Sequence, residues 1–418
     1  MNTNTLLRFG LLGILVIVIL VLVGWFFFLR GYQGEIAAFD AARGGGEDTP
    51  TFRNSIGSTY ENVAGNSGFG GIIATLPTLS DTSSATGTPA LPRLWQITKN
   101  PVAGAGFIEK RETGIATSTG VRFVERGTGY ILEADPMTGT LSRITNTLVP
   151  RIYEALIGKN GAVILRSLDE GGNVVTAIGH ATSTPSDGEG LGSLVVTPLS
   201  QNIRSITVLP DGDFLYLVAS ANGATVMRKE GGKEAEGIAA LGVSGWHIRS
   251  YSDVTLLTQN PSSNTVNHAY TLGEGGALVE TVPPARDLYV LPRENSSALL
   301  YSAGFSLYGR IGATTSTITL PVRTTAEKCV WAPGTSLIAY CAVPQTSPTS
   351  ALDAWRRGEM HTRDGWWRID VSAGQAEQLY APENAVIDVE NPSIDSSGSY
   401  LLFMNRIDKS LWSLRVNG

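Results

Sequence analysis

Short runs of alternating or fully apolar β-forming residues make up the chain from about residue 91 to residue 418. Gly, Pro, Asn, Asp and Ser separate these runs at close intervals, and stretches with the 3.6-residue period of a helix are nearly absent. This pattern predicts an all-β domain over residues 91–418.

A recurring unit is visible within this part: an apolar pair, a tight turn and a strongly apolar strand. Clear copies read LIGKNGAVILR, VLPDGDFLYLV, YSDVTLLT, VLPRENSSALLYS, VWAPGTSLIAYC and PSIDSSGSYLLFM. The turns of seven such units fall at Gly120, Gly161, Gly212, Asp253, Ser296, Gly334 and Gly398. Most intervals are close to the length of about 40 to 45 residues that one four-stranded propeller blade needs. We therefore predict seven blades, with each turn joining the innermost strand of a blade to its second strand.

The two ends of this repeat complement each other. The last copy, after Gly398, supplies two strands and then the chain stops, so it lacks an outer strand. One surplus strand, LPRLWQIT (residues 91–98), precedes the first complete unit. Because a propeller has an exposed seam unless both termini share a blade, the surplus strand is predicted to complete the last one. Two stacked β-sandwiches, the alternative, explain neither the period nor this match.

The first ninety residues have a different pattern. Between Arg8 and Arg30 lie 21 uncharged, mostly apolar residues, which as a helix would span about 31 Å, the thickness of a bilayer's hydrocarbon. We predict a short cytoplasmic tail over residues 1–8, a transmembrane helix over residues 9–29 and a flexible Gly-, Ser- and Thr-rich stalk over residues 30–90. A cleavable signal peptide is the alternative, but no A-x-A site closes the apolar run. Basic residues do not decide the orientation, and the usual form of a signal anchor leaves the C-terminal domain outside the cytoplasm.

The turn-plus-strand unit resembles the repeat of TolB-like and WD-repeat-like β-propellers, here as LPDGDFLYL, APGTSLIAY and SIDSSGSYLLF. The resemblance covers residues 91–418 and implies a fold only, because one fold hosts many functions. The order of anchor, stalk and propeller is similar to uncharacterised membrane-anchored bacterial propeller proteins. That similarity implies a placement in the cell and no activity.

Composition and the absence of known motifs exclude several classes of function. The chain has 31 basic against 37 acidic residues and a net charge of −6, which argues against a nucleic-acid binder because such a protein needs a basic face. Its four His are scattered without metal-ligand spacing, so neither a metal nor a cofactor is predicted. The chain contains neither a G-x-S-x-G nucleophile elbow nor a GxxxxGK[ST] phosphate loop. No catalytic residue is therefore predicted.

The two cysteines, Cys329 and Cys341, lie in the segment CVWAPGTSLIAYC. A five-residue hairpin loop from Pro333 to Leu337 would place them directly opposite each other on neighbouring strands. Opposed residues of an antiparallel ladder have Cα atoms about 4.5 to 5.5 Å apart, within reach of a disulfide. We predict the disulfide; two buried free thiols are the alternative, which a change of one residue in the loop length would favour.

The interval from Gly334 to Gly398 is longer than the others and contains an insertion, AVPQTSPTSALDAWRRGEMHTRDGWWRID. Trp and Arg often dominate binding hot spots, and long loops on a rigid β-scaffold often carry recognition. The alternative is packing, which we favour for Trp366 and Trp367 as the start of a third strand and which stays open for residues 355–361. The candidate partner-binding residues are Trp355, Arg356, Arg357 and His361.

These observations lead to a hypothesis of function. We expect a single-pass membrane protein that contacts the lipid bilayer through residues 9–29. Its seven-bladed propeller would serve outside the cytoplasm as a binding or scaffolding module for a protein partner in the cell envelope. The alternative is a carbohydrate-active hydrolase or lyase with carboxylates converging on the propeller channel. Three or more acidic side chains clustered at one channel mouth would favour the enzyme, and an apolar or small-residue channel would favour the scaffold.

Overall fold

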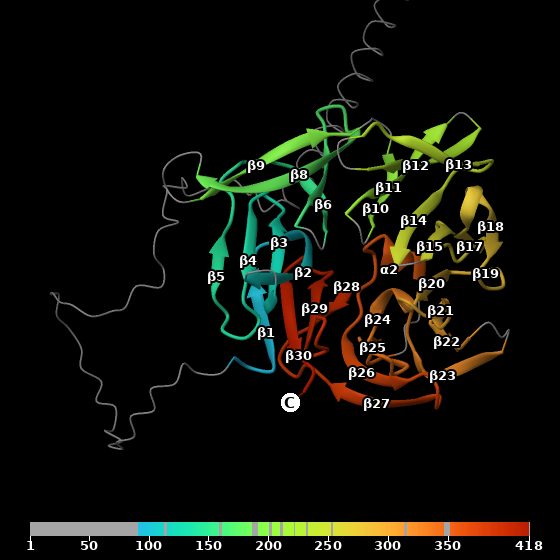
Figure 1. Cartoon of the computed structure of the whole chain (residues 1–418). Helices are drawn as coiled ribbons and strands as arrows, with labels where there is room; N and C mark the ends of the chain where they lie inside the picture. The colour runs from blue at the N-terminus through green and yellow to red at the C-terminus, as the bar shows by residue number, and fades with distance from the viewer. Residues whose placement is uncertain are drawn as a thin grey trace, which may run out of the picture. The chain divides into compact units, whose positions relative to one another are not determined.

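Seven four-stranded antiparallel sheets make up the computed structural model of the chain, which is a seven-bladed β-propeller as the repeat predicts (Figure 1). The structure describes residues 91–417 apart from short gaps at 113–114, 159–160, 186–190, 200–202, 210–211, 221, 231–232, 252–253, 313–315 and 347–351. The predicted tail, transmembrane helix and stalk, residues 1–90, lie outside the described residues. Within the described part, no helix has the length and apolar character needed to cross a membrane.

Blades 1 to 4 follow the chain, each built from the innermost strand outward. Blade 1 consists of β2 (Val102–Glu112), β3 (Ile115–Glu125), β4 (Ile131–Ala134) and β5 (Leu141–Arg143). Blade 2 consists of β6 (Ile152–Ile157), β7 (Val163–Leu168), β8 (Val174–Pro185) and β9 (Gly192–Pro198). Blade 3 consists of β10 (Ile203–Val208), β11 (Phe214–Ser220), β12 (Gly223–Lys229) and β13 (Glu236–Leu241). Blade 4 consists of β14 (Trp246–Tyr251), β15 (Val254–Gln259), β17 (Ala269–Leu272) and β18 (Leu278–Glu280).

Blades 5 and 6 repeat this order, and blade 7 takes one strand from the other end of the domain. Blade 5 consists of β20 (Leu288–Pro292), β21 (Leu299–Ala303), β22 (Ser306–Arg310) and β23 (Thr317–Arg323). Blade 6 consists of β24 (Cys329–Trp331), β25 (Ile338–Pro344), β26 (Asp364–Asp370) and β27 (Gln375–Tyr380). Blade 7 consists of β28 (Val389–Ile394), β29 (Tyr400–Asn405), β30 (Leu411–Arg415) and β1 (Leu94–Thr98). The smaller elements are β16 (Val266–Asn267), β19 (Ala285–Arg286), η1 (Glu274–Gly276), η2 (Ala326–Lys328) and α2 (Leu352–Arg356).

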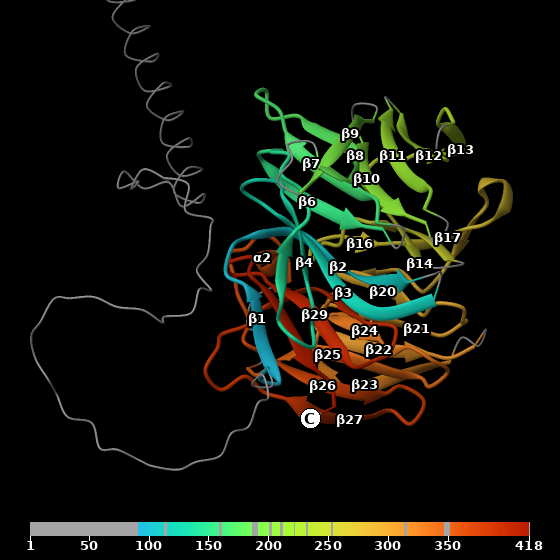
Figure 2. The same cartoon turned by 60° about the vertical axis from the view of Figure 1, so that its left-hand side comes forward.

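The predicted closure is confirmed, because β1 is the outer strand of blade 7. It runs antiparallel to β30, with Leu94 opposite Leu414. Figures 1 and 2 both show the blue β1 beside the red strands of the C-terminus. The side chain of Arg93 adds a second tie, since its Nη2 donates to the carbonyl oxygen of Val416 at 2.8 Å. The surplus strand and the incomplete blade therefore form one sheet.

One predicted turn is wrong. Gly120 lies inside β3, opposite Ile108 in the ladder, and not between the first and second strands of blade 1. The reason is that β2 and β3 are each 11 residues long, so β2 ends at Glu112 and β3 already begins at Ile115, ahead of Gly120. Five of the other predicted turn positions fall between the first and second strands of their blades, namely Gly161, Gly212, Ser296, Gly334 and Gly398. The sixth, Asp253, lies outside the described residues.

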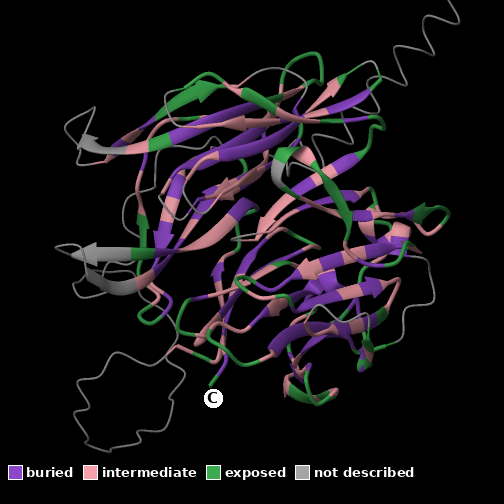
Figure 3. Ribbon diagram, turned by 45° about the vertical axis from the view of Figure 1, so that its right-hand side comes forward, coloured by how far each residue is buried: buried purple, intermediate pink, exposed green. Residues whose placement is uncertain are grey.

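The core consists of seven apolar clusters, each of which joins two neighbouring blades. Because successive residues of a strand point to opposite faces, the second strand of a blade packs against both neighbours. In β29, Leu401 and Phe403 pack within blades 6 and 7, whereas Leu402 and Met404 pack against blade 1. This explains why these strands are apolar throughout, and Figure 3 shows the buried residues concentrated along the strands of the blades.

Candidate functional site

A cavity of about 1670 Å³ lies at one face of the propeller. Its rim is formed by the turns between the first and second strands of blades 5, 6 and 7, which supply residues 293–296, 333–335 and 395–396. Blades 1 and 2 complete the wall, and Tyr251 at the end of β14 contributes from blade 4. We call this side of the propeller, defined by those three turns, the turn face.

Three carboxylates from three different blades line this cavity: Glu109, Glu294 and Asp395. Asp395 serves its own turn, because its Oδ1 accepts hydrogen bonds from the backbone N–H groups of Ser399 and Tyr400, each at 2.7 Å. Among the described residues, no group of three or more His, Cys, Asp or Glu is placed to hold a metal ion. The cavity therefore carries acidic groups at one mouth without a metal-binding cluster.

Two arginines of the cavity wall join neighbouring blades. Arg293 donates through Nη2 to the carbonyl oxygen of Gly334 at 2.6 Å, and its guanidinium lies 5.9 Å from the centre of the Trp331 ring. Arg122 donates to Glu133 at 2.6 Å and to the carbonyl oxygen of Gly161 at 3.1 Å. These arginines hold the rim together, so the cavity has a fixed outline.

The inner strand of blade 4 places a further set of polar side chains beside this cavity. In β14, Trp246 and Ile248 pack against blade 3, so the alternate residues His247, Arg249 and Tyr251 face the other way. Burial, and next the charge of Arg249, lowers the pKa of His247 to about 4, which leaves this imidazole neutral at pH 7.

Arg249, Tyr251 and Tyr289, which we call the Arg249 cluster, meet between blades 4 and 5. The guanidinium carbon of Arg249 lies 4.6 Å from the centre of the Tyr289 ring, and the hydroxyls of Tyr251 and Tyr289 share a hydrogen bond. Burial raises the pKa of both tyrosines, so their hydroxyls stay protonated. Sequence reasoning missed this cluster. The feature that could have revealed it is the polar residue at every second position of WHIRSY (residues 246–251), because this segment is the innermost strand of a blade.

The described part of the insertion predicted for recognition, from Leu352 onward, lies at the opposite face, where the inner strands begin. Its helix α2 bridges several blades there, because Arg356 binds Asp287 at 2.6 Å and Glu327 at 3.3 Å. Asp353 accepts a hydrogen bond from the backbone N–H of Ser263 in blade 4 at 3.0 Å. We call this side of the propeller, marked by Asp287 and Glu327, the start face.

Trp355 packs into the protein, which is the alternative that the sequence leaves open for residues 355–361. Its side chain is 4% exposed, and its Nε1 donates to the carboxylate of Asp388 at 2.8 Å. The ring lies between two cations, with Lys328 Nζ at 4.8 Å and the Arg406 guanidinium at 4.6 Å from its centre. An indole with a buried acceptor for its N–H is more stable inside the protein than in water, so this side chain packs.

The other three candidate residues are divided between packing and surface. The side chain of Arg356 is 17% exposed and engaged by Asp287 and Glu327. Arg357 is 58% exposed and pairs with Glu359 at 2.8 Å. His361 is 41% exposed, with Nδ1 3.2 Å from Asp388 Oδ2. The structure thus leaves Arg357 and His361 accessible and does not present the four side chains as one surface.

A buried ion network supports Trp355. Lys328 donates through Nζ to Asp364, Asp388 and Thr362, each at 2.6 Å, and the side chains of Lys328 and both aspartates are fully buried. Burial raises the pKa of Asp364 by more than Lys328 lowers it. For Asp388, burial acts in the same direction, but the charge of Lys328 and hydrogen bonds from Lys328, Trp355 and Thr362 outweigh it, and its pKa is lowered.

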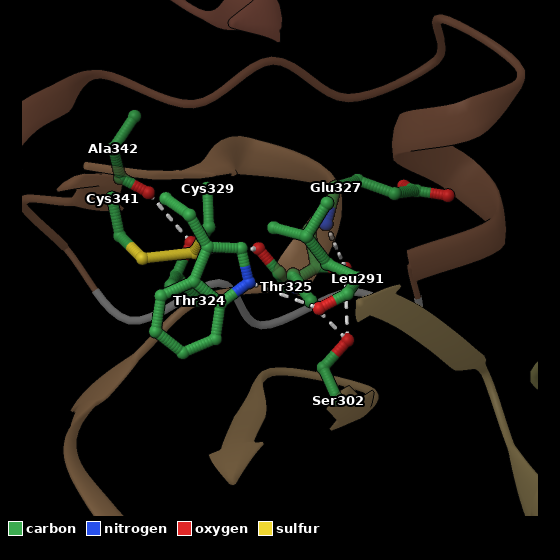
Figure 4. Close-up of a disulfide and its surroundings, with 10 residues drawn as sticks. Leu291, Ser302, Thr324, Thr325, Glu327, Cys329, Cys341 and Ala342 are labelled. Carbon is green, nitrogen blue, oxygen red and sulfur yellow. Dashed lines mark hydrogen bonds between the residues drawn. A yellow bond between two sulfur atoms is a disulfide. The ribbon is translucent and has the colours of Figure 1, made fainter. Parts of the chain in front are cut away.

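The segment that carries Lys328 is held by a disulfide between Cys329 and Cys341, which lie opposite each other in β24 and β25 (Figure 4). Thr324, just before this segment, donates through Oγ1 to the carbonyl oxygen of Ala342 at 2.6 Å. The hydroxyls of Thr325 and Ser302 lie 3.1 Å apart. Cys329 also lines the cavity, so the disulfide fixes the strand that connects the cavity wall to the start face.

Comparisons with known proteins bear on the fold alone. No protein-family model matches the chain, and a search of curated proteins finds no match either. Virginiamycin B lyase from Staphylococcus aureus is 13% identical, with a TM-score of 0.47 over 77% of this chain and 98% of that one. Oligogalacturonate lyase from Vibrio parahaemolyticus is 10% identical, with a TM-score of 0.47 over 76% of this chain and 99% of that one. A glucose dehydrogenase is 12% identical, with a TM-score of 0.40 over 77% of this chain and 99% of that one. At these identities and TM-scores we transfer no activity to this chain.

Proposed function

We propose that the chain is a membrane-anchored, extracytoplasmic propeller that works as a binding module in an envelope assembly. The anchor rests on the sequence of residues 9–29, and the resemblance to TolB-like propellers rests on the repeat. The similarity to membrane-anchored bacterial propeller proteins rests on the order of anchor, stalk and propeller. The observation that carries the binding role is the cavity at the turn face. Six blades contribute to its wall, and arginines bound to neighbouring turns fix its rim. A large preformed hollow of this kind is the usual place for a ligand or a partner's projecting segment.

The two faces have different tasks in this proposal. The start face is tied together by α2, whose Arg356 and Trp355 are committed to Asp287, Glu327 and Asp388. Among the described residues, the turn face carries no such insertion, and its rim residues Asn295 and Thr335 are exposed. The partner would therefore bind at the turn face, and the insertion would act as a brace.

Cross-linking of the full-length chain in its native membrane, followed by affinity capture, tests the proposal. We expect a partner whose capture is lost when Thr335→Trp adds bulk to the cavity rim. Arg357→Trp, a similar change on the start face, is the matched control and should leave capture unchanged. Capture that responds equally to both variants, or the absence of any partner, would refute the binding role of the cavity.

A carbohydrate-active enzyme is the second candidate, because Glu109, Glu294 and Asp395 line one mouth. Asp395 is bound by its own turn, so Glu109 and Glu294 would have to supply the acid and the base. Incubation with neutral and acidic polysaccharides, with detection of new reducing ends, tests this reading. Cleavage by the parent chain that Glu294→Gln abolishes would establish it, and the same cleavage by that variant would exclude this assignment.

A further inference from the structure

We propose that the Arg249 cluster is a binding site for a carboxylate group of a ligand that enters through the cavity at the turn face. The inference rests on the proposed function, because it names the chemistry that the cavity recognises. It concerns three side chains, Arg249, Tyr251 and Tyr289, that the sequence does not mark by any motif.

The position of Arg249 is the first observation. Its guanidinium lies over the ring of Tyr289 in blade 5 and within electrostatic reach of Glu154 in blade 2 and Glu327 in blade 6. A side chain on blade 4 can approach all of these blades only by extending toward the propeller axis. Arg249 therefore projects into the central channel.

The charge of Arg249 is the second observation. Glu154 accepts a hydrogen bond from Arg166 at 2.5 Å, and Glu327 binds Arg356 at 3.3 Å. Each nearby carboxylate is thus already paired with another arginine. In the part of the chain that the structure describes, no hydrogen bond or ion pair engages the Arg249 guanidinium. Of the three arginines Arg166, Arg356 and Arg249, it is therefore Arg249 whose N–H donors remain available to a ligand.

The chemistry of the cluster selects the ligand group. A guanidinium presents N–H donors in a planar fork that matches the two oxygens of a carboxylate. The hydroxyls of Tyr251 and Tyr289 remain protonated. Because one of them donates to the other in their mutual hydrogen bond, the pair has one O–H left to donate to the same oxygens. Partial burial strengthens such charge-assisted bonds relative to water. The set of donors is suited to an anion and offers no cluster of carboxylates for a cation.

The cavity provides the route to this site. Tyr251 lines the cavity, as does Leu291, which lies two residues after Tyr289 on β20. A ligand that enters past the exposed rim residue Asn295 therefore meets Tyr251 before Arg249. The remainder of the ligand would lie among Phe107, Trp331 and the polar turns of the rim.

Titration calorimetry of the full-length chain in detergent micelles tests the site with two matched pairs of probes. Glucuronate and glucose differ in the carboxylate of a sugar, and acetyl-Asp-amide and acetyl-Asn-amide differ in the carboxylate of a peptide unit. We expect at least one acidic probe to bind and its neutral partner to bind at least ten-fold more weakly. The pair that responds identifies a sugar acid or an acidic peptide as the source of the carboxylate.

Variants connect that binding to the cluster. Arg249→Gln should weaken the acidic probe about ten- to a hundred-fold, the range for a hydrogen bond to a charged group. Arg143→Gln is the matched control, because Arg143 lies 4.9 Å from the centre of the Tyr130 ring on the outer strand of blade 1, and it should leave binding unchanged. If Arg249→Gln does not fold, Tyr251→Phe replaces it, with a several-fold weakening expected.

The proposal is overturned if neither acidic probe binds, if acidic and neutral probes bind equally, or if the cluster variant binds as tightly as the parent chain. Capture of the membrane partner is measured separately. Capture of a partner without probe binding would reject the carboxylate site and still support the binding module. Probe binding without a captured partner would support the carboxylate site and reject the binding module.

Discussion

The burial of Trp355 predicts that α2 is a structural brace whose loss destabilises the propeller. Trp355→Ala removes an almost fully buried indole, which costs about 3 to 5 kcal/mol when the surroundings do not collapse. The hydrogen bond to Asp388 adds only about 1 kcal/mol, because Lys328 and Thr362 still bind that carboxylate. Arg406 also keeps its bonds to the carbonyl oxygens of residues 355 and 356. We therefore expect a total loss of about 4 to 6 kcal/mol.

Thermal unfolding followed by circular dichroism measures this effect. A loss of about 4 to 6 kcal/mol should lower Tm by roughly 8 to 12 °C, at about 2 °C per kcal/mol for a domain of this size. Trp355→Phe keeps most of the ring and loses the N–H donor, so its Tm should lie between those of Trp355→Ala and the parent chain. Arg357→Ala is the control, because an exposed residue usually changes stability by no more than about 0.5 kcal/mol. A Tm of Trp355→Ala within 1 °C of that of Arg357→Ala would refute the reasoning and return α2 to the role of an exposed recognition loop.

Three further predictions concern pH, packing and closure. The pKa of His247 is about 4 against its ordinary 6.5, so between these pH values the unfolded chain binds a proton that the folded chain lacks. Stability should fall by up to about 3 kcal/mol as the pH drops through this window, and His247→Gln should show a shallower fall in Tm; equal slopes would contradict this. A Cβ on Gly104 would lie 1.8 Å from the carbonyl oxygen of Ala155, whereas one on Gly127 would meet nothing within 4 Å. Gly104→Ala should therefore lower Tm through about 1 to 3 kcal/mol of overpacking, and a Tm equal to that of Gly127→Ala would be inconsistent with the blade contact. A chain that begins at residue 99 lacks β1 and leaves the outer edge of β30 unpaired, so it should melt well below one that begins at residue 88; coincident melting curves would count against closure through β1.

The sequence predicted those features that depend on local period and register. Blade number, closure by residues 91–98 and the opposition of Cys329 and Cys341 follow from turn spacing, and the structure has the same arrangement. Gly120 was misplaced because β2 and β3 have 11 residues each and are longer than the first two strands of every other blade, so the second strand begins before Gly120.

The site was less predictable because its contacts join distant parts of the chain. Trp355 packs because Asp388 and Lys328 surround it, and those residues lie 33 and 27 positions away in sequence. The Arg249 cluster depends on Tyr289 from the next blade, which only the closed ring brings beside Arg249. Side-chain type can suggest that Trp and Arg take part in binding, but burial decides which of them are free to do so.

The central claim is that a partner binds at the turn face, and site-specific photo-cross-linking measures this most directly. A photoreactive benzoylphenylalanine would replace Asn295 on the rim of the cavity in one variant and Arg357 on the start face in another. Both positions are exposed in the structure. After irradiation in the native membrane, we predict a discrete cross-linked product from position 295 and none from position 357. A product from position 357 alone would contradict the account and show that the partner binds the face that carries α2.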